Sequence, residues 1–185
     1  MKTNRFRLIF IIFSTFFVWN CQKQTIDYEK IAIEVTKEAK SNLQEKLMKA
    51  MKEGGTEAAI PFCQENAMAF TKRLGVAKSV TLQRITDRPR NQMNLFSTEE
   101  AKIFSEIQKQ KSNDGVFPNR VVSSDELVTV YVPIVVMGQC VQCHGKPENI
   151  TKETKTTLQR FYPNDQAIGY EVGDLRGLFS VRFPK

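Results

Sequence analysis

The fold is decided by residues 127–144, which read LVTVYVPIVVMGQCVQCH. The first ten of these residues are rich in β-branched side chains, which predicts a strand over 127–136. The strand leads directly into Cys140-Val141-Gln142-Cys143-His144, and His144 is the only histidine of the chain. A predicted strand therefore delivers two thiols and one imidazole to the same place.

The spacing of Cys140, Cys143 and His144 has a chemical reason. Two thiols three residues apart lie on one turn of backbone, and each can add across one vinyl group of a haem. The residue that follows presents its imidazole to the iron as the proximal ligand. The motif thus predicts one covalently bound haem c.

Two other interpretations of the motif stay open. The two motif thiols, His144 and Cys63 could complete a zinc site, although the side chains of the neighbours Cys143 and His144 diverge and rarely reach one tetrahedral ion. The cysteines could instead be a thiol redox pair, which normally lies between a strand and a helix N-terminus. Here a glycine and a proline soon follow the motif.

The first twenty residues have the pattern of a bacterial lipoprotein signal peptide. Residues 1–7 carry three basic side chains and no acidic one, and residues 8–18 are apolar apart from a serine and a threonine. This apolar run is too short to span a bilayer comfortably but suits a secretory segment. Cys21 follows almost at once, which predicts lipidation of Cys21 and a short tether over 21–27. An ordinary exported protein and an uncleaved leader are the alternatives.

Export agrees with the haem interpretation, because bacteria attach c-type haem outside the cytoplasmic membrane. We therefore expect a periplasmic, membrane-anchored lipoprotein. Once Cys21, Cys140 and Cys143 are assigned, Cys63 is the only cysteine left, so there is no set from which to build a disulfide framework.

Composition excludes some classes of partner. The formal net charge is +7, and removal of the three basic residues of the leader leaves about +4. No run of Lys and Arg forms a nucleic-acid footprint, so we expect no nucleic-acid partner. The remaining length suits one domain with a sizeable core, which we place at 28–185.

Hydrophobic periodicity and turn residues predict the remaining elements. They are helices over 28–52 and 56–74 separated by Gly54-Gly55, a strand over 79–86, a helix over 97–111 opened by a capping box, a hairpin of 116–122 with 127–136, a helix over 151–160, and a hairpin of 169–172 with 177–183. The predicted class is α+β, with N-terminal helices packed against a mainly antiparallel sheet.

The sixth iron ligand is not settled by the residues alone. Bis-histidine ligation is excluded within one chain, which leaves a methionine or Cys63, on the apolar side of the helix over 56–74. A free cysteine is commonly a small buried hydrophobe, and a methionine is commonly core filler. A buried thiolate is costly unless a metal ion binds it. The candidate methionines are Met48, Met51, Met68, Met93 and Met137.

From about residue 28 onward the chain resembles a family of bacterial single-haem domains with a PAS-like fold, the Tll-type haem domain. The matching stretches are 60–65, 84–94, 140–145, 162–170 and 173–177. The resemblance implies a PAS-like sheet and an axial pair formed by His144 and Cys63. It also places four arginines and a tyrosine in family segments: Arg84, Arg88, Arg90, Arg176 and Tyr170.

Arginines often hold haem propionates through paired hydrogen bonds, and a tyrosine hydroxyl can donate another. These five residues are therefore candidate propionate ligands, and the alternative is that the arginines solvate a loop.

A membrane-anchored sensor of redox state or of a small gas ligand is the function we expect. Thiolate ligation should lower the reduction potential, and loss of the cysteine on reduction would open one face of the iron. An output would require an unidentified partner protein. The alternative is a low-potential electron carrier whose positive charge steers it to acidic partners. A peroxidase is not expected, because no second histidine exists to act as distal base.

Overall fold

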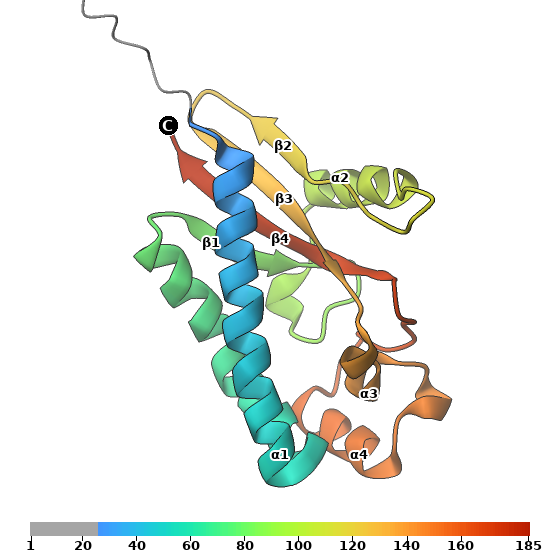
Figure 1. Cartoon of the computed structure of the whole chain (residues 1–185). Coiled ribbons are helices and arrows are strands. Elements are labelled where there is room, and N and C mark those ends of the chain that lie inside the picture. The colour runs from blue at the N-terminus through green and yellow to red at the C-terminus, as the bar shows by residue number, and fades with distance from the viewer. Residues whose placement is uncertain (1–25) are drawn as a thin grey trace, which may run out of the picture.

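The structure is a computed structural model that describes residues 26–185. The expected signal peptide, Cys21 and most of the tether lie outside the described residues. The described part consists of one long interrupted helix, a four-stranded sheet and several short helices (Figure 1). The predicted α+β class is confirmed. Between residues 26 and 185, no helix is long and apolar enough to cross a membrane.

Helix α1 (Tyr28–Ala77) is broken into two arms at Gly54 and Gly55. Gly55 has φ +62° and ψ −154°, a conformation that essentially only glycine adopts. The first arm, residues 28–53, runs across the sheet, and the second arm, residues 56–77, turns back beside it (Figure 1). The two predicted helices and the glycine break between them are therefore confirmed.

The sheet has the order β1-β4-β3-β2, and every neighbouring pair is antiparallel. Its strands are β1 (Thr81–Ile85), β2 (Arg120–Ser123), β3 (Leu127–Val135) and β4 (Leu175–Pro184). The predicted hairpin is present as β2 and β3, although β2 begins four residues later than expected. Residues 112–116 form a turn instead, in which the Ser112 N–H donates to the Val116 carbonyl.

The strand predicted over 169–172 is wrong. The N–H groups of Gly169 and Tyr170 donate to the carbonyls of Gly145 and His144, so this segment supports the Cys-x-x-Cys-His motif rather than a ladder. Gly169 also has φ +82°, which interrupts an extended run. The last strand, β4, pairs with β1 and β3 instead.

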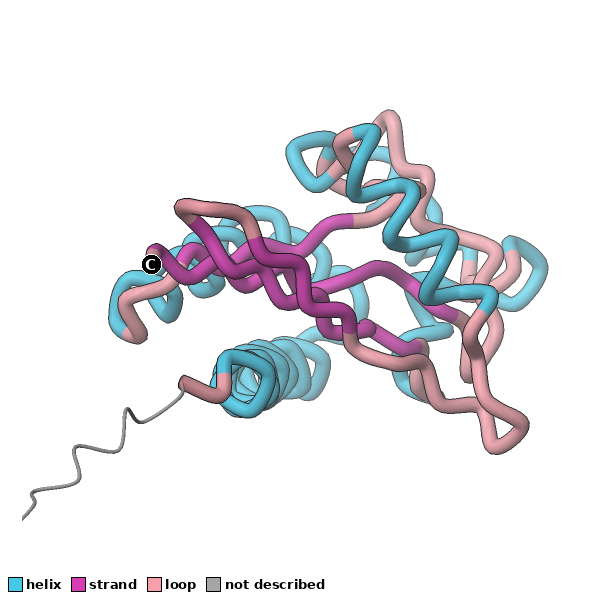
Figure 2. Tube along the Cα trace, turned by 90° about the horizontal axis from the view of Figure 1, so that it is seen from above, coloured by secondary structure: helices cyan, strands magenta, loops and turns pink. Residues whose placement is uncertain are grey.

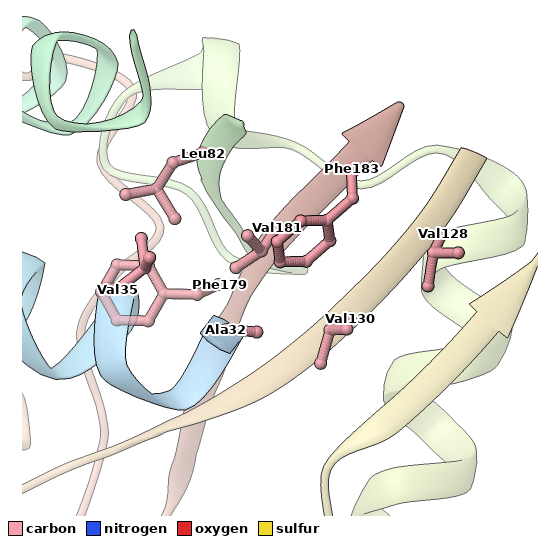
Figure 3. Close-up of a cluster of buried hydrophobic side chains, with 8 residues drawn as sticks. All are labelled: Ala32, Val35, Leu82, Val128, Val130, Phe179, Val181 and Phe183. Carbon is pink, nitrogen blue, oxygen red and sulfur yellow. The ribbon is translucent and has the colours of Figure 1, made fainter. Parts of the chain in front are cut away.

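Apolar side chains fill both faces of the sheet. On one face the first arm of α1 packs on a cluster that includes Ala32, Val35 and Val181 (Figure 3). Figure 2 views this arm almost end-on, on one side of the strands. Helix α2 (Thr98–Lys109) supplies Phe104 and Ile107 to a second cluster. The predicted capping box of Ser97 and Glu100 opens α2.

Short helices gather at the end of the molecule remote from the two ends of the described chain (Figure 1). They are α3 (Val141–His144), α4 (Lys152–Phe161) and the 3₁₀ turns Gly138–Cys140 and Pro147–Asn149, while a further 3₁₀ turn, Gln92–Asn94, follows β1. The Thr56 hydroxyl lies 2.6 Å from that of Thr154, so the start of the second arm is bonded to α4. The functional motif is thus placed where the helical arms, β3 and α4 meet.

Candidate functional site

A cavity of about 300 Å³ lies between the two arms of α1, strand β1, the end of β3 and helix α3. Most of its wall is apolar, and a few polar groups converge on it. This size and lining are typical of a small-molecule or cofactor site.

Seven of the nine predicted haem-binding residues line this one cavity. They are Cys63, Arg84, Arg90, Cys140, Cys143, His144 and Arg176. They come from the second arm of α1, from β1 and the turn after it, from the motif, and from β4. Residues far apart in the sequence are therefore brought together.

Arg88 and Tyr170 lie behind the cavity wall instead. Tyr170 is 2% exposed and meets the His144 ring edge-on, with 6.5 Å between ring centroids. The Arg88 guanidinium lies over the Tyr170 ring at 3.8 Å, and its Nε donates to the Tyr170 hydroxyl at 3.1 Å. The predicted propionate role of these two residues thus gains no support from the geometry, because neither lines the cavity and Arg88 donates to protein acceptors.

The motif itself is held by backbone hydrogen bonds. The Gly145 N–H donates to Val141 O at 2.9 Å, and the Gly145 carbonyl accepts from the Gly169 N–H at 2.8 Å. A Cβ on Gly145 would lie 2.4 Å from Val141 O, so a side chain does not fit there. The residue after His144 must therefore be glycine if the turn is to close.

The His144 ring is fixed in one tautomer. Its Nδ1 lies 2.7 Å from the carbonyl oxygen of Ala167, which can only accept, so Nδ1 carries the proton. Burial, followed by the charges of Arg90 and Arg176, holds the pKa of His144 well below its ordinary value. The imidazole is therefore neutral at physiological pH with Nε2 unprotonated, which is the form that binds a metal.

Arg90 donates hydrogen bonds both to the loop 162–170 and to the Cys-x-x-Cys-His motif. Its Nε lies 3.0 Å from Asp165 Oδ2, and its Nη2 donates to the carbonyls of Cys143 and Ala167. Asp165 in turn accepts from the Ala167 N–H at 2.8 Å. Arg90 therefore lines the cavity, but its Nε and Nη2 groups already donate to protein acceptors.

Arg84 and Arg176 are different, because neither has a carboxylate within 4 Å among residues 26–185. Arg176 donates to the Thr86 hydroxyl at 2.7 Å. Burial lowers the pKa of both guanidinium groups, and each is further lowered by a neighbouring arginine. Two poorly solvated cations without a carboxylate in direct contact are costly, so the cavity suits an anionic group.

Cys63 lies in the wall of the second arm. Burial raises the pKa of its thiol, while the Arg84 charge opposes this and the Cys143 thiol adds to it. Four methionines also line the cavity: Met48, Met51, Met68 and Met137. Met93 does not, and it is 69% exposed. The candidates for a sixth ligand thus fall to Cys63 and four methionines.

The zinc alternative gains no support. In the described part of the chain, no three His, Cys, Asp or Glu side chains come together in a way that could hold a metal ion. Cys63, Cys140 and Cys143 are all free thiols.

Asp165, Ala167 and Tyr162 belong to the site but were not predicted. Asp165 and Ala167 position His144, and the Tyr162 phenol lines the cavity, where burial and then the Cys63 thiol raise its pKa to about 12. All three lie in the segment 162–170 that carries the family resemblance. That segment could have flagged them, but their contacts with Arg90 and His144 depend on the tertiary fold.

Comparisons with known proteins agree with this architecture. The sequence model of the Tll0287-like family matches residues 20–184. Among solved structures, the crystal structure of the cyanobacterial haem protein Tll0287 matches with a TM-score of 0.63 and 20% sequence identity, covering 86% of this chain and 98% of that one. At this identity the match shows a shared fold. No curated protein sequence matches the chain.

Proposed function

Because this chain belongs to the Tll0287-like family, we propose that it binds one haem c in the cavity, with thioether bonds from Cys140 and Cys143 and with His144 as proximal ligand. The observation that carries the proposal is the hydrogen bond from His144 Nδ1 to Ala167 O, which leaves Nε2 free for a metal in a cavity that two thiols also line. The protein of similar structure, Tll0287, is a haem protein, which supports the same cofactor.

The charges of the cavity fit this group. A haem carries two propionates, and Arg84 and Arg176 are two poorly solvated guanidinium groups without carboxylate partners in residues 26–185. Pairing them would remove the cost of burying both cations. We therefore assign Arg84 and Arg176 to the propionates.

Cys63 is our proposed sixth ligand. It lies in the wall formed by the second arm, where burial raises the pKa of its thiol and the charges of Arg84 and Arg90 oppose that rise. Binding to a metal ion would offset the cost of a buried thiolate. A thiolate stabilises ferric iron and lowers the reduction potential. Reduction of a bound haem would weaken a bond to Cys63, and release of Cys63 would open one face to a gas such as CO or NO.

These properties suit a sensor of redox state or of a small gas ligand. The PAS-like character of the sheet, export to the periplasm and a lipid anchor on Cys21 are parts of the same proposal. The sequence pattern of residues 1–21 supports export and anchoring. A Cys21→Ala variant should leave the membrane fraction, and continued anchoring would contradict lipidation.

The first test is whether the matured protein carries haem. A pyridine haemochrome assay should give one haem per chain, and intact mass should rise by that of one haem. Colourless protein after expression with the haem-attachment machinery would refute the proposal.

A second test separates the sensor from a low-potential electron carrier. Stopped-flow mixing of the reduced protein with CO or NO should give an adduct whose formation is limited by loss of Cys63. Rapid, reversible electron exchange with no adduct would instead identify a carrier.

A further inference from the structure

Asp165 and Arg90 form an ion pair behind the Cys-x-x-Cys-His motif. The pair is well shielded, with Arg90 13% and Asp165 10% exposed, and 3.0 Å separates Nε from Oδ2. The other ion pair next to the motif, Lys146 with Glu171, is 47% and 64% exposed. Only the first pair is therefore protected from solvent screening.

Both partners reach the residue that orients His144. The Ala167 N–H donates to Asp165 Oδ1 at 2.8 Å, and the Ala167 carbonyl accepts from His144 Nδ1 at 2.7 Å. Arg90 Nη2 also donates to that carbonyl, at 3.4 Å, and to the carbonyl of Cys143. One arginine thus joins the motif to the loop that faces it.

This loop has no regular structure of its own between the end of α4 and β4. Its position depends on a few hydrogen bonds, including Gln166 N–H to Pro89 O at 3.1 Å. A planar guanidinium with five fixed donors can hold several acceptors in one geometry, whereas an ammonium cannot.

We propose that Asp165 and Arg90 are positioning residues that clamp the Ala167 carbonyl on His144 Nδ1 and thereby set the reduction potential of the haem. This inference rests on the proposed function. Partners of the second ring nitrogen fix the orientation of a ligating histidine and raise its basicity as a ligand. A firmly held carbonyl therefore favours ferric iron and lowers the potential.

Asp165→Asn tests the clamp, because it should raise the reduction potential in two ways. Loss of the carboxylate leaves the Arg90 charge uncompensated beside the cavity, which favours ferrous iron. The Ala167 carbonyl also loses its support, which weakens the hydrogen bond to His144. We expect the equilibrium to move at least about tenfold toward the ferrous form, a rise of about 59 mV in a spectroelectrochemical titration.

Arg90→Lys separates geometry from charge. It keeps the positive charge but cannot serve Asp165 and two carbonyls together, so the potential should rise by less than in Asp165→Asn. In a Cys63→Ala background, the iron–histidine stretching band of the ferrous protein should move to lower frequency in resonance Raman spectra. The double variant Asp165→Asn/Arg90→Lys should raise the reduction potential by less than the sum of the two single-variant rises, because both residues act on one carbonyl.

Glu171→Gln is the matched control. It also removes one carboxylate from an ion pair beside the motif, but the Glu171 side chain does not touch the Ala167 or Cys143 carbonyl. Its potential should stay close to that of the wild type. Circular dichroism at increasing temperature shows whether each variant is folded.

Two results would overturn the clamp. One is a folded, haem-bearing Asp165→Asn protein with the wild-type potential and the wild-type iron–histidine band. The other is an equal rise in potential in Glu171→Gln, which would mean that any nearby carboxylate has this effect. Absence of haem from the wild-type protein would instead refute the proposed function, so the two failures are distinguishable.

Discussion

The two walls of the cavity are held in different ways. The wall that carries His144 is fixed by hydrogen bonds, since the loop 162–170 contacts the motif through Gly145 O, His144 O and His144 Nδ1. The wall formed by the arms of α1 presents Cys63, aliphatic side chains and Met48, Met51 and Met68. Thioether side chains are flexible and adapt to irregular space.

This difference suits the proposed pair of ligands, one constant (His144) and one exchangeable (Cys63). Directional bonds hold the imidazole in a single orientation. Apolar packing has no preferred direction, so a side chain such as Cys63 can move without leaving many polar groups unpaired. A constant proximal side and an adaptable opposite side would suit the ligand-exchange sensor proposed above.

Removal of the proposed constant ligand should have the largest effect. His144→Ala deletes the only imidazole of the chain, and no other residue replaces it. We expect nearly complete loss of haem-bearing protein, measured as pyridine haemochrome per polypeptide. Gln142→Ala changes an exposed residue inside the motif and should keep the haem. Normal haem content in His144→Ala would mean that the thiols suffice.

Loss of the proposed exchangeable ligand should have a smaller effect. Cys63→Ala should retain the haem but shift the ferric absorption spectrum from low spin toward high spin, because one axial position becomes free. Met68→Leu removes a sulfur from the same arm and should leave the spectrum unchanged. The opposite pattern would make Met68 the ligand and would end the assignment of Cys63.

The tight packing of the hydrogen-bonded wall can be tested through the free energy of unfolding of glycine variants. Gly145→Ala would place a Cβ 2.4 Å from Val141 O, and overpacking of this kind costs about 1–3 kcal/mol. Urea unfolding gives this difference. Gly138→Ala is the matched control, because nothing lies within 4 Å of its added Cβ. Equal stability of both variants would show that the backbone near Val141 shifts to accommodate the added methyl group.

The smallest expected effect concerns the attachment of the second arm to α4. Thr154 is 1% exposed and its hydroxyl lies 2.6 Å from that of Thr56, so Thr154→Val should lower the free energy of unfolding by about 1–2 kcal/mol. Thr156→Val, on the exposed side of α4, should change it by less than about 0.5 kcal/mol. A loss no larger than in this control would mean that the arm is held by packing alone.

Structural features that depend on residues close together in the sequence were predictable. The Cys-x-x-Cys-His run, the glycine break at Gly54-Gly55 and the capping box at Ser97 each act over a few positions. Cys63 is a candidate from the apolar side of its helix, and the family resemblance makes it half of the expected axial pair. The strand expected over 169–172 failed because its N–H groups bond to the motif. Local pattern cannot show such a partner.

The arginines illustrate the same limit. Arg88 and Arg90 stand in one turn and look equivalent in the sequence. In the fold, Arg88 lies over the Tyr170 ring and Arg90 bonds to Asp165. Which acceptor each one reaches is decided by a loop some eighty residues further along the chain.

The placement of the two chain ends has a consequence for reach. Tyr28, at the start of α1, packs on Phe183 near the C-terminus, with 5.1 Å between their ring centroids. The first arm then extends roughly 40 Å toward α3 and α4. An anchor preceding Ile26 would attach the molecule to the membrane at the end away from the cavity. The cavity would then lie away from the lipid headgroups, at the end of the molecule that diffusing proteins can approach.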